Sequence, residues 1–154
     1  MSADVPQPGR VAGVDYGTVR IGIALSDPSR RWVSPHEVYT RGDEARDAEF
    51  FRQLVQQEDV TLLVVGLPVH LNGRESEKSG EARRFAHWLG EVTGAAVELF
   101  DERFTSAEAD TLMAPRELTR RSRRQRRDAV AASVMLTAYL ESGRRDDASR
   151  ALDE

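Results

Sequence analysis

The pattern of hydrophobic and polar positions predicts three strands at the start of the chain and alternating helices and strands after them. Alternating and continuous apolar runs bounded by glycine, proline and aspartate are typical of strands, and a 3.6-residue period is typical of helices. The expected strands span residues 10–16, 19–26, 32–39, 61–66 and 95–100. The expected helices span residues 43–58, 75–92, 105–113 and 127–142.

This order of elements predicts an α/β fold built on one mixed five-stranded sheet. The first three strands follow each other through short turns and are expected to be antiparallel, whereas strands joined through helices are expected to be parallel with right-handed crossovers. Helices should then cover both faces of the sheet. We expect one domain over residues 10–143, a disordered segment over residues 1–9 and a flexible charged tail over residues 144–154.

Composition narrows the class of protein. The chain has 154 residues and no cysteine, which excludes disulfides and thiolate zinc sites and fits a reducing compartment. Residues 1–9 carry acid and proline without an apolar core, so they do not resemble a signal peptide. The longest apolar run, residues 62–67, is too short to cross a bilayer. A cytoplasmic protein with no membrane partner is expected.

Charge is distributed unevenly along the chain. The formal net charge is −4, yet seven arginines fall between Arg116 and Arg127, with Glu117 the only acid among them. A local basic segment on an acidic protein can bind a polyanion in a salt-dependent way. The alternative is a solvated arginine-rich loop, since the chain uses lysine only at Lys78.

Three acids follow or interrupt apolar elements. Asp15 lies beside Val14 and, across the turn, Ile23, where a carboxylate loses much of its water unless a cation or hydrogen bonds compensate. Glu102 follows a later strand, and Asp128 opens the last helix. If that helix packs with its amino end toward the same sheet edge, the three carboxylates converge. Carboxylate oxygens suit Mg²⁺ or Mn²⁺, and a pair of such ions can promote phosphodiester hydrolysis.

Each acid also has a structural alternative. Asp15 could accept hydrogen bonds from the backbone of the turn that follows it. Asp101 or Glu102 could pair with Arg103 or cap a helix, and sequence alone does not choose between these two acids. Asp128 could have only a structural role, in which its negative charge interacts favourably with the dipole of its own helix.

Taken together, these segments resemble the YqgF family, also called RuvX, a group of RNase H-like proteins related to the RuvC Holliday-junction resolvases. Four motifs in the family's order carry the resemblance over about residues 10–143. The matching segments are Val14-Asp15-Tyr16-Gly17-Thr18 with residues 21–24, Val64-Val65-Gly66-Leu67-Pro68 with Asn72-Gly73, residues 101–106, and residues 128–132 with Leu136, Tyr139 and Leu140.

The resemblance implies an RNase H-like fold and a metal-dependent nuclease. It assigns Asp15, Glu102 and Asp128 as ligands of Mg²⁺ or Mn²⁺, with Asp15 bridging two ions. By resemblance, the role is maturation of the 5′ end of precursor 16S rRNA, with Holliday-junction resolution as the alternative. Nucleic acid is the implied partner, ribosome-assembly factors are possible further partners, and the chain is a monomer or a homodimer. The candidate phosphate-binding residues are Arg103, Arg123, Arg124, Arg126 and Arg127.

Two departures from the family and two rival functions stand beside this interpretation. His70 takes a position where relatives often carry asparagine, and the arginine-rich loop 114–125 lacks glycine. An Asp-x-Gly-Thr turn also resembles the phosphate-binding hairpin of actin-like and sugar-kinase ATPases, but the chain has one copy of it. The other rival is a non-catalytic RNase H-like nucleic-acid-binding module.

Overall fold

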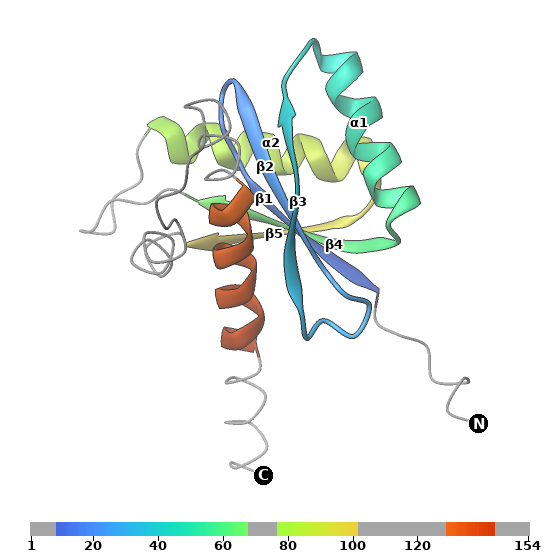
Figure 1. Ribbon diagram of the computed structural model, residues 1–154. Coiled ribbons are helices and arrows are strands. Elements are labelled where there is room, and N and C mark those ends of the chain that lie inside the picture. Colours follow the sequence, from blue (N-terminus) through green and yellow to red (C-terminus); the bar gives the residue numbers. More distant parts are fainter. Residues whose placement is uncertain (1–8, 68–76, 102–128, 144–154) are drawn as a thin grey trace, which may run out of the picture.

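The computed structural model describes residues 9–67, 77–101 and 129–143 (Figure 1). Its strands are β1 (Arg10–Asp15), β2 (Arg20–Ser26), β3 (Val33–Thr40), β4 (Val60–Leu67) and β5 (Ala96–Asp101). Its helices are α1 (Glu44–Gln57), α2 (Glu77–Thr93) and a segment over residues 129–143, which we call the C-terminal helix. The expected helix at 105–113, the loop after it and the tail from 144 lie outside the described residues, as does nearly all of the segment 1–9.

The five strands form one mixed sheet in the order β3-β2-β1-β4-β5. The pairs β1–β2 and β2–β3 are antiparallel, whereas β1–β4 and β4–β5 are parallel. Three antiparallel strands followed by parallel ones are the arrangement predicted from the sequence. Because β1, β4 and β5 run in the same direction, their last residues meet at one side of the sheet, which we call the carboxyl edge.

Helices cover both faces of the sheet, as predicted. Ala12 and Val14 of β1 belong to the larger apolar cluster, which is completed by Phe51 of α1 and Leu89 of α2. Val11 belongs to a second cluster with three buried residues of the C-terminal helix. This division follows from the alternation of side chains along a strand. Figure 1 shows α2 and the C-terminal helix on opposite sides of the sheet.

Local signals account for where α1 begins and α2 ends. Asp43 has extended backbone angles, and its side chain accepts a hydrogen bond of 2.8 Å from the Arg46 backbone N–H, the usual role of an N-cap residue. Gly94 follows α2 with a φ of 75° and donates its N–H to the Gly90 carbonyl. Within the described ranges, no helix is long and apolar enough to cross a membrane.

Candidate active site at the carboxyl edge

Asp15 is the last residue of β1, at the carboxyl edge in the middle of the sheet. It is half-buried and lies opposite Gly22 of the antiparallel neighbour β2. Side chains alternate along a strand, so Asp15 belongs to the same face as Val11 and Gly13. That face is the one covered by the C-terminal helix, because Val11 packs in the cluster formed with that helix.

Gly13 shows how closely the C-terminal helix lies on β1. A β carbon added at Gly13 would lie 2.9 Å from the Leu136 β carbon and 3.1 Å from the Ala132 carbonyl oxygen. Asp15 is two residues further along the same face of the strand. Asp128 precedes Ala132 by four residues, about one helical turn.

The register of the parallel strands relates Asp15 to the end of β5. Val14 is aligned with Val65, which is aligned in turn with Leu99, and β5 continues from Leu99 to Asp101. Glu102 is the next residue in the sequence. Strand ends brought together in this way are where α/β proteins gather ligands and catalytic groups.

Of the predicted site residues, the structure places Asp15 alone. The other two acids, Glu102 and Asp128, lie outside the described residues, and so do His70 and all five candidate phosphate-binding arginines. These arginines are Arg103, Arg123, Arg124, Arg126 and Arg127. Within the described part of the chain, no group of three His, Asp or Glu residues could hold a metal ion. The half-buried carboxylate of Asp15 is a hard oxygen donor that fits Mg²⁺ or Mn²⁺.

The turn after Asp15 is shaped by Gly17. A β carbon at this position would lie 2.2 Å from the Arg20 carbonyl oxygen, a distance that atoms do not tolerate. The backbone therefore folds tightly directly after Asp15, and only glycine fits there.

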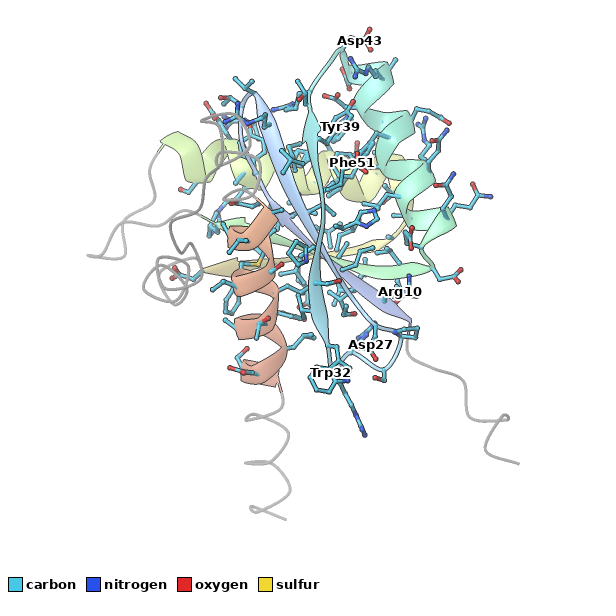
Figure 2. All side chains as sticks on the ribbon, viewed as in Figure 1. Arg10, Asp27, Trp32, Tyr39, Asp43 and Phe51 are labelled. Carbon is cyan, nitrogen blue, oxygen red and sulfur yellow. The ribbon has the colours of Figure 1, made fainter. Side chains whose placement is uncertain are left out.

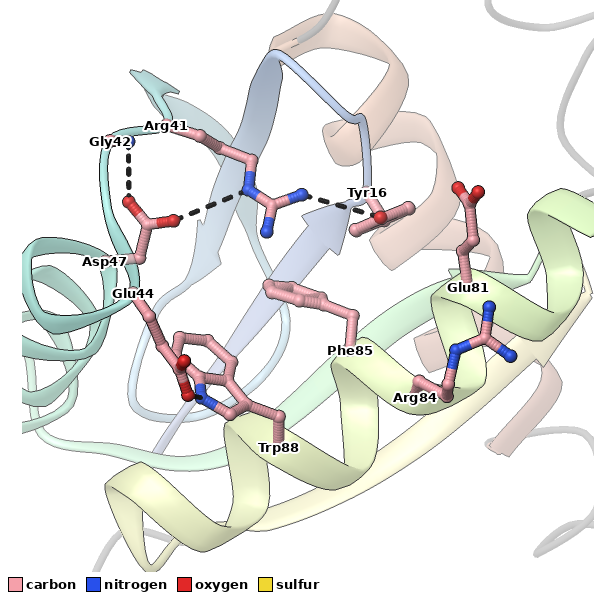
Figure 3. Close-up of a pocket in the computed structure, with 9 residues that line it drawn as sticks. All are labelled: Tyr16, Arg41, Gly42, Glu44, Asp47, Glu81, Arg84, Phe85 and Trp88. Atoms are coloured by element: carbon pink, nitrogen blue, oxygen red, sulfur yellow. Dashed lines mark hydrogen bonds and ion pairs between the residues drawn. The ribbon is translucent and has the colours of Figure 1, made fainter.

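Arg41, which follows β3, holds this turn in place (Figure 3). Its backbone N–H donates to the Val19 carbonyl at 2.9 Å, and its guanidinium donates to the Gly17 carbonyl at 3.3 Å and the Tyr16 hydroxyl at 3.4 Å. The guanidinium also lies 5.5 Å from the centre of the Tyr16 ring. Sequence reasoning missed Arg41, because nothing in its local pattern connects it with a turn more than twenty residues earlier.

A buried carboxylate anchors Arg41 to α1. Asp47 is 3% exposed, accepts hydrogen bonds from the Tyr39 hydroxyl at 2.7 Å and the Gly42 backbone N–H at 2.8 Å, and lies 3.5 Å from the Arg41 guanidinium. Burial and the hydrogen bond to Asp47 raise the pKa of Tyr39 to about 12. The hydroxyl therefore stays protonated and continues to donate at neutral pH.

A cavity of about 340 Å³ opens beside Tyr16, between the start of α1 and the middle of α2. Figure 3 shows its lining, with Arg41 between the α1 side and the aromatic side. The lining residues are Tyr16, Arg41, Gly42, Glu44, Asp47, Glu81, Arg84, Phe85 and Trp88. The sequence prediction contained no such cavity, although the spacing of Phe85 and Trp88 on one face of a helix was a usable signal.

Comparisons with known proteins point to one family. Residues 9–142 match the model of the RuvX family, whose description is Holliday junction resolvase. A relative from Rhodopirellula baltica, named "Putative pre-16S rRNA nuclease", is 48% identical over 139 residues, covering 90% of this chain and 80% of the relative. A relative of the same name from Anaeromyxobacter sp. (strain K) is 39% identical over 132 residues, covering 86% of this chain and 96% of the relative.

Solved structures show the same fold at low sequence identity. Thermus thermophilus RuvC in complex with a Holliday junction substrate has a TM-score of 0.54 at 16% identity, covering 88% of this chain and 96% of that one. The Fowlpox virus resolvase with its Holliday junction DNA has a TM-score of 0.55 at 9% identity, covering 86% and 97%. The RNase H-like fold predicted from the sequence is thereby confirmed. With the family model matching nearly the whole chain, this protein belongs to the RuvX family.

Proposed function

We propose that this protein is a metal-dependent endonuclease that hydrolyses phosphodiester bonds, with the 5′ end of precursor 16S rRNA as its substrate. The observation that carries the proposal is the position of Asp15, half-buried at the carboxyl edge and on the face of the sheet that the C-terminal helix covers. The names of the relatives support the substrate, and the membership of the RuvX family supports the chemistry.

The proposed residue roles follow from the chemistry of carboxylates. Asp15, Glu102 and Asp128 would hold the Mg²⁺ or Mn²⁺ ions through their carboxylate oxygens. Such ions, when bound, lower the pKa of water and offset the charge that develops on the leaving oxygen. The tight turn at Gly17 and its hydrogen bond from Arg41 support the proposal, because they restrict the backbone directly after Asp15.

The arginines of the segment from 103 to 127 would bind the substrate backbone. Arginine presents a planar fork that matches two phosphate oxygens, whereas lysine offers a single point charge. Arg103, Arg123, Arg124, Arg126 and Arg127 would therefore hold the strand that Asp15 and its partner acids cut. We expect this contact to take place in the cytoplasm.

A side-by-side cleavage assay tests the proposed substrate. Purified protein is incubated with precursor 16S 5′-leader RNA and with a four-way DNA junction, in Mn²⁺, in Mg²⁺ and in a chelator. The proposal predicts metal-dependent cutting of the RNA at a defined position, with the junction cut more slowly. Asp59→Asn is the matched control variant, since Asp59 lies at the opposite end of the parallel strands and has a φ of 51°, which asparagine accepts.

Junction resolution is the second candidate, and it is favoured by the description of the matching family. Preferential cutting of the junction would identify branched DNA as the substrate and would be consistent with the same proposed metal site. Binding of either substrate without any cutting would contradict the nuclease proposal and favour a nucleic-acid-binding module.

A further inference from the structure

We propose that the cavity beside Tyr16 binds a single nucleobase of the substrate strand, belonging to a nucleotide next to the phosphodiester that is cut. This inference rests on the proposed nuclease function and names a specificity subsite for it. The cavity volume of about 340 Å³ is large enough for one base with part of its sugar, and too small for a folded segment of a partner.

Aromatic rings form one wall of the cavity. Tyr16 and Phe85 have ring centres 5.0 Å apart, and Phe85 and Trp88 have ring centres 5.6 Å apart with planes 27° from parallel. Tyr16 and Trp88 are only partly buried and pack at the margin of the larger apolar cluster. Aromatic faces of this kind stack on the bases of single-stranded nucleic acid, whatever the base.

The charges that line the cavity favour a base over a phosphate. Three acids, Glu44, Asp47 and Glu81, outnumber the two arginines, Arg41 and Arg84, so the cavity repels an additional anion. A base is neutral, and its edge carries both hydrogen-bond donors and acceptors. The cavity therefore matches a base more closely than it matches a phosphate.

Two of these charged side chains remain available to a ligand. Asp47 is engaged with Tyr39 and Gly42, and Glu44 accepts a hydrogen bond of 3.0 Å from the Trp88 indole. Glu81 and Arg84, by contrast, have no partner among the residues that the structure describes, and Figure 3 shows both on the α2 side of the cavity. Glu81 can accept from a base N–H, and Arg84 can donate to a base carbonyl or ring nitrogen.

The position of the cavity connects it with the candidate metal site. Tyr16 lines the cavity and directly follows Asp15, so their α carbons are about 3.8 Å apart. Tyr16, one residue beyond β1, packs against the larger apolar cluster, whereas Asp15 belongs to the face covered by the C-terminal helix, so the two residues lie on opposite faces of the sheet. To reach both sites, a substrate strand must pass over the end of β1, with a phosphate at Asp15 on one face and the neighbouring base in the cavity on the other.

Trp88 fluorescence tests this inference without any cleavage. The chain has two tryptophans, and Trp32 is 76% exposed at the β2–β3 turn (Figure 2), so Trp32→Phe leaves Trp88 as the one reporter. Oligoadenylate, oligouridylate and inorganic phosphate are titrated in a chelator. We expect saturable quenching by the oligonucleotides and none by phosphate, because stacking changes the indole environment and phosphate has no base.

Substitutions of the two available side chains make the test specific. Glu81→Gln and Arg84→Gln are introduced into the Trp32→Phe protein. Each should raise the Kd measured by quenching about five- to tenfold, because each removes a hydrogen-bonding charge from the cavity. The matched controls are Glu37→Gln in β3 and Arg31→Gln in the β2–β3 turn, both of which lie outside the cavity lining and should leave Kd unchanged. Absence of quenching, or equal effects of the test and control variants, would overturn the inference.

Abasic substrates connect the cavity with cleavage. An abasic nucleotide placed at successive positions around the cut should slow wild-type cleavage about tenfold at one position only, and Arg84→Gln should reduce this sensitivity. Cleavage that is indifferent to every abasic position would overturn the cavity inference and leave the nuclease function standing. Quenching that requires the base, in a protein that cuts nothing, would support the cavity and contradict the nuclease proposal.

Discussion

At the scale of single residues, two glycines define the surroundings of Asp15. Gly13 allows the C-terminal helix to lie directly on β1, with Ala132 and Leu136 in the space where a side chain would stand. Gly17 allows the turn that follows Asp15 to close against the Arg20 carbonyl. Asp15 is thus held between a covered strand and a tight turn, which limits how far its carboxylate can move.

Gly17→Ala should reduce both stability and activity. The new β carbon would lie 2.2 Å from the Arg20 carbonyl oxygen, so the backbone of the turn must move, at a cost of about 1–3 kcal/mol in the free energy of unfolding. Urea denaturation and a cleavage assay on the same sample measure the two effects.

Gly90→Ala in α2 is the matched control for this substitution. Its β carbon would meet the nearest atom, a Val97 methyl group, at 3.4 Å, and alanine is the better helix former by up to about 1 kcal/mol. Unchanged stability and activity in Gly17→Ala would contradict the account of the turn.

Asp27, at the opposite end of the sheet, should confer acid sensitivity (Figure 2). Hydrogen bonds from the Ser29 side chain and from the Trp32 and Arg31 backbone hold the pKa of its carboxyl far below the ordinary value of 3.8. Because the folded pKa is the lower one, the stabilisation is present above pH 3.8 and is lost as the pH falls further.

The acid dependence is measured as the difference in the free energy of unfolding between wild type and Asp27→Asn, obtained by urea denaturation at several pH values. The asparagine variant should be less stable at neutral pH, and the difference should narrow steadily below about pH 3.8. A constant difference across the acid range would show that the charge of Asp27 contributes nothing.

At the scale of elements, one buried polar group joins β3, α1 and the turn after Asp15. The Asp47 carboxylate accepts from the Tyr39 hydroxyl on β3 and from the Gly42 N–H before α1, and it lies beside the Arg41 guanidinium. Arg41 in turn donates to the Gly17 carbonyl. Such a connection fixes the distance between α1 and the carboxyl edge, since a buried carboxylate is stable only while its partners are in place.

Tyr39→Phe should destabilise the fold by about 1–3 kcal/mol, because it removes a donor to a buried carboxylate. The pKa of Tyr39 is raised above its unfolded value of 10.0 to about 12, so the contribution is complete below pH 10 and is lost as the pH rises through 12. Urea denaturation at neutral pH and in the alkaline range follows both effects.

Tyr139→Phe is the comparison for Tyr39→Phe. Its hydroxyl also donates to an acid, Glu98, and burial together with this bond raises its pKa to about 12, but the pair lies at the surface. The cost should therefore be smaller than for Tyr39→Phe. Equal costs would contradict the importance given to burial of Asp47.

Most of the elements could be predicted from the sequence, because their signals are local. The apolar run of β4 and the change of period at α1 each depend on neighbouring residues. The position of Asp15 could be predicted for the same reason, since it is an acid at the end of an apolar strand. The contact of Arg41 with Gly17 and the cavity formed with Trp88 could not be predicted, because α1, α2 and the β1–β2 turn meet only in the folded chain.

At the scale of the whole molecule, charge is distributed unevenly between an acidic chain and one basic segment that we propose as the contact with the substrate. The chain carries a net charge of −4, yet the arginine-rich segment 116–127 is strongly basic. The cavity beside Tyr16 and the candidate site at Asp15 both carry acidic groups, so neither accounts for the proposed binding of substrate phosphates. The arginine-rich segment is the candidate, and salt dependence measures its part directly.

Replacing Arg123, Arg124, Arg126 and Arg127 by glutamine should flatten the dependence of RNA binding on salt. Each phosphate contact to a single strand contributes about 0.7 to the slope of log K against log salt, so four contacts change it by about 3. Fluorescence anisotropy at several salt concentrations measures the slope, and Arg31→Gln in the β2–β3 turn is the control that should not alter it. An unchanged slope in the fourfold variant would show that the segment is a solvated loop.

We propose that Asp15, Glu102 and Asp128 together hold the metal ions with which this protein would cut RNA. The measurement that tests it most directly is the single-turnover rate of precursor-RNA cleavage in Mn²⁺, with RNA affinity measured on the same proteins. Asp15→Asn, Glu102→Gln and Asp128→Asn should each lose more than about 100-fold in rate while keeping RNA affinity, and Asp101→Asn, beside Glu102 at the end of β5, should retain activity. Full activity in a folded Asp15→Asn protein, or loss in Asp101→Asn with Glu102→Gln unaffected, would contradict it.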